Sequence, residues 1–133
     1  ELAYISGCSM LLPREFLETV GLMSEDYFLY YEEIDWFTRA QGRYKICIAK
    51  DAMLYHREGA AIGSKSWQRS ASLLSDFHMF RSRLTYMRKH SRRFIGLCYV
   101  YSWLDVCKRL VRRQYRNAWT VSSVLLGKQS LGD

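Results

Sequence analysis

Apolar and polar positions along the chain follow two patterns that meet near residue 72. Before this position the apolar runs are short, and turn residues separate them. Pro13 suits the first position of a helix, and the residues after it predict a helix that stops at Gly21. A second helix is predicted over residues 32–41, because acidic side chains stabilise the start of a helix and Gly42 favours its end.

Strand patterns lie beside these helices. Residues 44–49 alternate between two faces, one of them lined by Tyr44, Ile46 and Ile48. Shorter extended or strand-like pieces are expected at residues 3–6, 10–12 and 52–56. The first part of the chain is therefore predicted to combine strands and helices.

The second part is predicted to be helical. From Leu73 to about Leu126 there is no proline and no strong turn signal, which indicates two or three helices. The clearest amphipathic pattern covers residues 94–116. Its apolar positions recur at helical spacing, whereas charged residues occupy the opposite side. The apolar positions are Leu97, Val100, Leu104, Cys107 and Val111, and the charged ones are Asp105, Arg109, Arg112 and Arg116.

Composition confirms an ordinary globular chain but shows an uneven charge. Hydrophobic residues make up 49% of the 133 positions and charged residues 25%, which excludes a disordered chain. Residues 1–62 carry six basic and ten acidic side chains, a net of −4, and residues 63–133 carry fourteen and three, a net of +11. No apolar stretch reaches the roughly 18 residues of a membrane-spanning helix.

Three carboxylates gather at the start of the second predicted helix. Glu32 and Asp35 are three positions apart and share a face, and Glu33 points about a third of a turn away. Carboxylates this close repel one another, which raises at least one pKa and suits proton abstraction or metal binding. The ordinary alternative is that acidic residues favour helix starts and simply face water. His56, at the end of a strand-like run, is a second candidate, with a structural role as its alternative.

The basic, aromatic second half allows three interpretations. Nucleic-acid binding requires exposed aromatics and arginines along a groove. An interfacial membrane helix requires an apolar face flanked by Lys and Arg. The apolar run at residues 94–107 is too continuous for a solvated groove, which favours an anionic membrane surface over nucleic acid. A buried helix with a solvated basic face is an equal alternative to the membrane.

Several motifs occur in a characteristic order. They comprise residues 7–14, residues 20–25, residues 27–36 with Arg39 and Gly42, and residues 52–59. This series resembles the C-terminal half of a family 2 glycosyltransferase catalytic domain of the rhamnosyltransferase-like type, and it covers about residues 3–90.

The resemblance implies a fold, a reaction and a set of site residues. The fold is α/β: residues 1–72 are the C-terminal part of a Rossmann-like GT-A domain, and residues 73–133 are a basic helical appendage. The reaction is inverting transfer of a sugar, rhamnose among the family's donors, from a nucleotide-sugar to a glycan or lipid-linked acceptor. Glu33 corresponds to the catalytic base and Asp35 supports it. The substrate-binding positions are Gly7, Glu32, Trp36 and Arg39, and His56 corresponds to a metal ligand.

The resemblance also implies what lies outside this sequence. The family's Asp-x-Asp metal motif precedes the region of Gly7, and no Asp of this chain has another Asp two residues away. The chain is therefore expected to be a fragment, inactive alone, with the main ligands of a Mg²⁺ or Mn²⁺ ion upstream. Its expected place is the cytoplasmic, inner face of the cell membrane. The alternative function is a basic helical module that binds nucleic acid or protein without catalysis.

Overall fold

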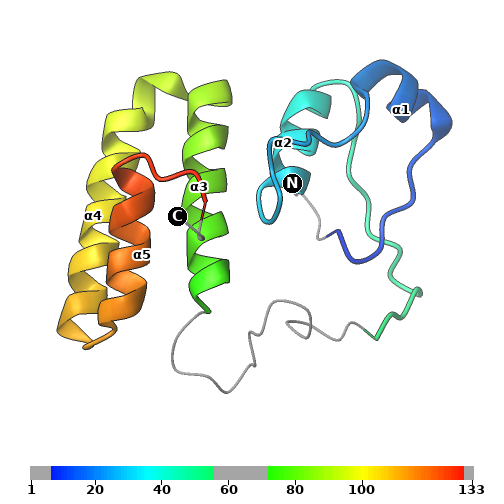
Figure 1. Cartoon of the computed structure of the whole chain (residues 1–133). Coiled ribbons are helices and arrows are strands. Elements are labelled where there is room, and N and C mark those ends of the chain that lie inside the picture. Colours follow the sequence, from blue (N-terminus) through cyan, green and yellow to red (C-terminus); the bar gives the residue numbers. More distant parts are fainter. Residues whose placement is uncertain (1–6, 56–71, 131–133) are drawn as a thin grey trace.

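The computed structural model describes residues 7–55 and 72–130, and these residues fold into helices joined by turns and irregular segments (Figure 1). In chain order the helices are α1 (Arg14–Val20), α2 (Glu32–Ala40), α3 (Leu73–His90), the short 3₁₀ helix η1 (Arg92–Phe94), α4 (Ile95–Val111) and α5 (Tyr115–Leu125).

The α/β prediction is wrong for the described residues, since they contain helices and no strand. The C-terminal part of a Rossmann-like GT-A domain is thus not what residues 7–55 form. A strand exists only where its N–H and C=O groups bond to a neighbouring strand. Residues 44–49 have the alternating pattern of a strand, but no described segment pairs with them. The predicted pieces at residues 10–12 and 52–55 are irregular for the same reason, and residues 3–6 and 56 lie outside the described part.

The first two predicted helices are confirmed with small shifts at their ends. Pro13 is the N-cap of α1 rather than its first residue, and Gly21 ends the helix with a φ of 83° that favours glycine. Phe16 is buried between α1 and α2, where its ring meets Trp36 edge-on at a centroid distance of 5.2 Å. These two helices share a small apolar cluster of Phe16, Trp36 and Ala40.

The predicted helical half is confirmed as three α-helices, which lie side by side in Figure 1. Their buried faces form a larger apolar core of Phe77, Phe80, Leu84, Cys98, Val106, Ala118, Val121, Val124 and Leu125. The amphipathic segment expected over residues 94–116 breaks after Val111. The break contains no proline or glycine: Arg113 takes a φ of 57°, and the N–H of Gln114 donates to the carbonyl of Arg109.

A buried carboxylate ties the three long helices together. Asp76 of α3 accepts hydrogen bonds from Nη2 of Arg109 in α4 at 2.8 Å and from Nδ2 of Asn117 in α5 at 2.7 Å. A buried charge is stable only when it is paired and hydrogen-bonded, so this contact constrains how α4 is rotated. Two charged residues of α4, Asp105 and Arg109, thus face α3, and Arg83 of α3 reaches Asp105 at 3.6 Å.

The contact between the two helical groups is mostly polar. The Tyr30 hydroxyl lies 2.7 Å from Oγ of Ser75, and Oγ of Ser82 donates to the carbonyl of Leu29 at 2.8 Å. The two apolar clusters lie on either side of the boundary expected at residue 72, and the division into two domains stays a prediction.

The large core makes a stability prediction. Phe80→Ala removes a side chain that is 2% exposed, and we expect it to lower the free energy of unfolding by about 3–5 kcal/mol because it leaves a cavity. The matched control is Phe28→Ala, since Phe28 is 73% exposed, and its expected loss is below about 1 kcal/mol. Urea unfolding followed by circular dichroism measures both, and equal losses would contradict the core assignment.

Candidate functional site

The site is built around Asp35, whose side chain is completely buried. Its carboxylate accepts a hydrogen bond from the Tyr27 hydroxyl at 3.0 Å and from Nε of Arg39 at 2.9 Å. Nε2 of His90, the last residue of α3, lies 2.7 Å from Oδ1 of the same carboxylate. Asp35 therefore connects the loop before α2, α2 itself and the end of α3.

Arg39 and Trp36 extend this network to the chain that follows α1. The Arg39 guanidinium donates to the carbonyl of Val20 at 2.5 Å and to that of Leu22 at 2.7 Å. The Trp36 indole N–H donates to the carbonyl of Gly21 at 2.8 Å. Both side chains thus hold backbone of the protein itself, and the substrate-binding role expected of them stays a prediction.

The surroundings of Asp35 keep it ionised. Burial raises the pKa of a carboxyl, but here the hydrogen bonds from His90, Arg39 and Tyr27 outweigh burial and hold the pKa of Asp35 below its ordinary value of 3.8. The pKa of the Tyr27 hydroxyl is raised in turn, first by its own burial and then by the charge of Asp35. A buried carboxylate with a lowered pKa and three partners is a structural anchor and a poor proton acceptor.

Glu33 is in a different environment, at the first turn of α2. Its Oε1 accepts a hydrogen bond from the backbone N–H of Gly7 at 2.8 Å. A Cβ atom added to Gly7 would collide with this oxygen, so a larger residue there requires the Glu33 carboxylate to shift. The structure thereby brings together two residues that the sequence predicted for the site, Gly7 and Glu33, although they are 26 positions apart.

An unusual turn directs Glu33. Tyr30 and Tyr31, which immediately precede α2, have φ values of 66° and 72°. This left-handed conformation costs a non-glycine residue about 1–2 kcal/mol. Contacts from α3 hold it: Ser75 meets the Tyr30 hydroxyl, and the Tyr86 ring packs on the Tyr31 ring at a centroid distance of 5.4 Å. Strained backbone held in this way is frequent at functional sites.

Glu32, the other glutamate of this turn, is partly buried. Its Oε2 is buried and has no hydrogen-bond partner among the described residues. Burial raises the pKa of Glu32, a backbone hydrogen bond opposes this, and the charge of Glu33 raises the pKa further. Glu32 therefore takes up a proton more readily than an ordinary glutamate.

A shallow cavity of about 300 Å³ lies on the other side of Asp35. Its lining includes Leu22, Ser24, Asp35, Arg39, Lys89 and His90. Lys89 bonds to Oγ of Ser24 at 2.9 Å and pairs with Asp26 at 2.5 Å, where it lowers the pKa of the Asp26 carboxyl. Charged side chains therefore reach the cavity wall, and these charges are mutually paired.

Sequence reasoning missed His90, Lys89 and Tyr27 as members of this network. His90 is 55 positions from Asp35, and nothing within its own helix distinguishes it from a surface histidine. Tyr27 belongs to a crowded aromatic run in which no single ring stands out. The only signal in the sequence was that two basic residues, Lys89 and His90, stand next to each other near the end of a predicted helix.

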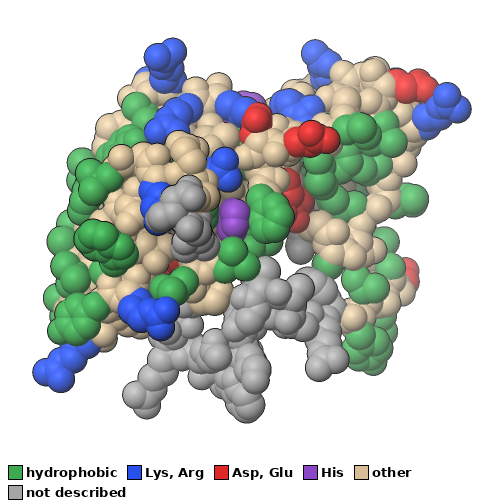
Figure 2. Space-filling view, in the orientation of Figure 1, with side chains coloured by type: hydrophobic (Ala, Val, Ile, Leu, Met, Phe, Trp, Pro, Cys, Tyr) green, Lys and Arg blue, Asp and Glu red, His purple; other side chains and the backbone are tan. Residues whose placement is uncertain are grey.

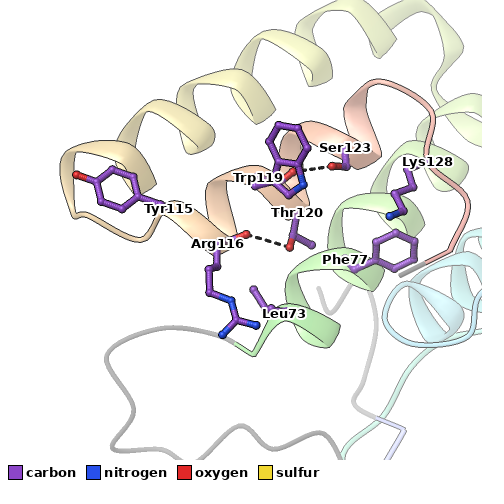
Figure 3. Close-up of a pocket in the computed structure, with 8 residues that line it drawn as sticks. All are labelled: Leu73, Phe77, Tyr115, Arg116, Trp119, Thr120, Ser123 and Lys128. Carbon is purple, nitrogen blue, oxygen red and sulfur yellow. Dashed lines mark hydrogen bonds between the residues drawn. The ribbon is translucent and has the colours of Figure 1, made fainter. Parts of the chain in front are cut away.

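A larger hollow of about 580 Å³ lies between α3 and α5 (Figure 3). Leu73, Phe77 and Trp119 provide much of its wall, and Arg116 stands at one end. The hydroxyls of Thr120 and Ser123 donate to carbonyls of their own helix, those of Arg116 and Trp119. Among the described residues no carboxylate or histidine lines the hollow, so these residues offer no acid–base pair.

The predicted metal ligand, His56, lies outside the described residues. Within residues 7–55 and 72–130 no group of three or more His, Cys, Asp or Glu side chains fits a metal ion. A site for Mg²⁺ or Mn²⁺ stays a prediction.

The pairing of Asp35 predicts how the free energy of unfolding depends on pH. Because the folded-state pKa of Asp35 is depressed, its carboxylate stabilises the fold above the ordinary value of 3.8, and this contribution is lost as the pH falls through the folded value. At pH 7 we expect Asp35→Asn to cost about 3–5 kcal/mol, since Arg39 loses its charged partner. The difference between wild type and variant, measured by urea unfolding, is expected to shrink below about pH 4. A difference that stays constant to pH 2 would contradict the assignment.

Comparisons with known proteins add no family. No family model matches the chain. Neither the curated proteins nor the solved structures contain a match to it. The resemblance to family 2 glycosyltransferases therefore rests on the ordered motifs alone.

Proposed function

We propose that the turn at α2 is the acceptor side of an inverting, nucleotide-sugar-dependent glycosyltransferase, with Glu33 as the general base. The observation that carries this proposal is the contact of Glu33 with the Gly7 N–H, directly beside the buried Asp35 network. The contact joins the first and third of the motifs on which the family resemblance rests.

The chemistry requires one base. The acceptor hydroxyl gives its proton to the Glu33 carboxylate as its oxygen attacks the anomeric carbon. The new carbon–oxygen bond forms on one face of the sugar, while the bond to the nucleoside diphosphate breaks on the opposite face. The configuration at that carbon is therefore inverted, and the electron pair leaves with the diphosphate.

The two carboxylates have different environments, which supports different roles. Asp35 is completely buried, holds three partners and has a lowered pKa. Glu33 is partly exposed and is oriented through one oxygen by a backbone N–H. A base must reach its substrate, so Glu33 suits proton transfer and Asp35 suits positioning.

The remaining parts of the proposal are the substrates. A nucleotide-sugar is the donor, with rhamnose as the sugar the resemblance favours, and a glycan or lipid-linked glycan is the acceptor. The alternative, a basic module that binds nucleic acid or protein without catalysis, has less support. Arg109 and Lys89, two of the basic side chains it would use, are already paired with Asp76 and Asp26.

The assignment of the base makes a kinetic prediction. In the enzyme expressed from its complete gene, Glu33→Gln is expected to lower kcat about 10²- to 10⁴-fold, because the amide cannot accept the proton. Nucleotide-sugar binding, measured by calorimetry, is expected to stay within about twofold, and transfer of labelled sugar measures turnover. Glu25→Gln is the matched control, since Glu25 is exposed and outside the network. An equal loss of binding and turnover would refute the base assignment.

The contact with Gly7 makes a second kinetic prediction. Gly7→Ala is expected to displace the Glu33 carboxylate and to lower kcat about 10²-fold, since misplacing a reacting group by about 1 Å has this effect. Because Gly7 is exposed, the free energy of unfolding should change little. Gly96→Ala is the control: Gly96 lies within α4 with open space for a Cβ, so kcat should stay unchanged and stability should rise by about 0.5–1 kcal/mol. Normal turnover in Gly7→Ala would exclude the contact from catalysis.

A further inference from the structure

The outer side of α4 is apolar and faces away from the other helices. Cys98, Ser102 and Val106 form its buried side. At 100° per residue, the exposed positions cover the opposite half of the helix. We call them the α4 outer face, and its apolar members are Leu97, Val100, Trp103, Leu104, Leu110 and Val111. Figure 2 shows hydrophobic side chains gathered over this side of the helix.

This exposed apolar face departs from the usual arrangement of a surface helix. A helix of a water-soluble protein normally turns its apolar side to the core and its charges to water. Here Arg109 of α4 contacts Asp76 of α3, and Asp105 of α4 contacts Arg83 of α3, while the apolar outer face has no such contact. As a result Leu104 is 49% exposed and Val111 is 85% exposed. No described residue covers this face. An exposed apolar face of this kind predicts a partner with an apolar surface.

Positive charge surrounds the same face. Arg92 and Arg93 precede α4, and Arg112 and Arg113 follow it, all of them exposed. The only acidic residue between positions 77 and 132 is Asp105, and it is paired with Arg83 and Lys108. The partner must therefore accept leucine and valine side chains at its centre and arginines at both ends.

We propose that the α4 outer face docks flat on the surface of an anionic lipid bilayer. Acyl chains accept the apolar side chains, and anionic headgroups neutralise the flanking arginines. Trp103 and Tyr101, both exposed, suit the headgroup boundary, where aromatic rings with a polar edge accumulate. None of the described helices is long and apolar enough to cross a membrane, so the contact is interfacial.

Other partners fit this face less well. A second copy of the chain that packs on it with the same face brings like charges together at both ends of the helix, and each such pair is repulsive. A nucleic acid satisfies the arginines but leaves the leucines and valines in water. The bilayer meets both requirements at once. Because anionic lipids are concentrated in the cytoplasmic leaflet, the proposal places the chain at the inner face of the cell membrane.

The proposal is tested by co-sedimentation of the full chain with vesicles. One set contains phosphatidylcholine with about one-third phosphatidylglycerol, and the other contains phosphatidylcholine alone. We expect binding to the anionic vesicles to be at least about tenfold tighter, because each basic residue near such a surface contributes roughly fivefold. Raising the salt from about 0.1 M to 0.5 M is expected to weaken it by a similar factor. Equal binding to both sets, or none, would overturn the proposal.

Variants assign the binding to the α4 outer face. Leu97→Ser with Leu104→Ser is expected to weaken binding at least tenfold without loss of helical circular dichroism, since both side chains are exposed. The matched control is Leu11→Ser with Leu22→Ser, two exposed leucines of the first half, and it should bind like wild type. Replacing Arg93 and Arg112 with Gln is expected to weaken binding to anionic vesicles, whereas the same change at Arg14 and Arg43 should not. Identical binding by test and control variants would refute the assignment.

Two further measurements distinguish the competing partners. Sedimentation velocity of the lipid-free chain is expected to show a monomer, and a dimer that Leu104→Ser dissociates would assign the face to a second copy. An RNA oligonucleotide is expected to bind weakly if at all. Tight RNA binding that the leucine variants retain, together with no vesicle binding, would assign the arginines to nucleic acid. Neither this proposal nor its test depends on glycosyl transfer, since vesicle binding is measured without any sugar substrate.

Discussion

The buried carboxylate of Asp35 is the contact on which the arrangement of the first half depends. Placing a charge where no water reaches it is costly, and the fold offsets that cost with Tyr27, Arg39 and His90. Because these partners come from a loop, from α2 and from the end of α3, satisfying one charge brings three segments together. Arg39 then extends the effect through its bonds to the carbonyls of Val20 and Leu22.

The same anchor explains how an exposed carboxylate can be held in place. Glu33 lies two residues before Asp35, so the position of its helix is determined by a buried charge rather than by its own contacts. The strained turn at Tyr30 and Tyr31 persists because α3 bonds to it through Ser75 and packs on it through Tyr86. In catalytic sites a reacting side chain is commonly held in place by buried neighbours, and here Asp35 is the buried neighbour and Glu33 the exposed side chain.

A second buried aspartate organises the helical half in a similar way. Asp76 holds Arg109 and Asn117, and this pairing keeps the Arg109 side of α4 against α3. Cys98 and Val106 of α4 are buried in the apolar core beside it. The apolar outer face of α4 is the side opposite to these contacts, and it leaves a surface that fits a bilayer.

Local signals in the sequence were enough to predict the helices and to place Glu33 at the start of one of them. Proline and glycine at the ends, acidic first turns and helical spacing act over about four residues, so they can be recognised without a fold. The absence of a sheet among residues 7–55 and 72–130, the partnership of Asp35 with His90 and the choice of the buried side of α4 depended on tertiary structure. A strand needs a neighbouring strand, and none is present among the described residues. A buried charge needs an opposite charge, and partners of Asp35 and Asp76 lie 55 and 33 positions away in the chain. The sequence by itself therefore determined which segments are helical, whereas tertiary structure decided which of their faces are buried, because the partners of the buried charges and the members of the apolar core come from different helices.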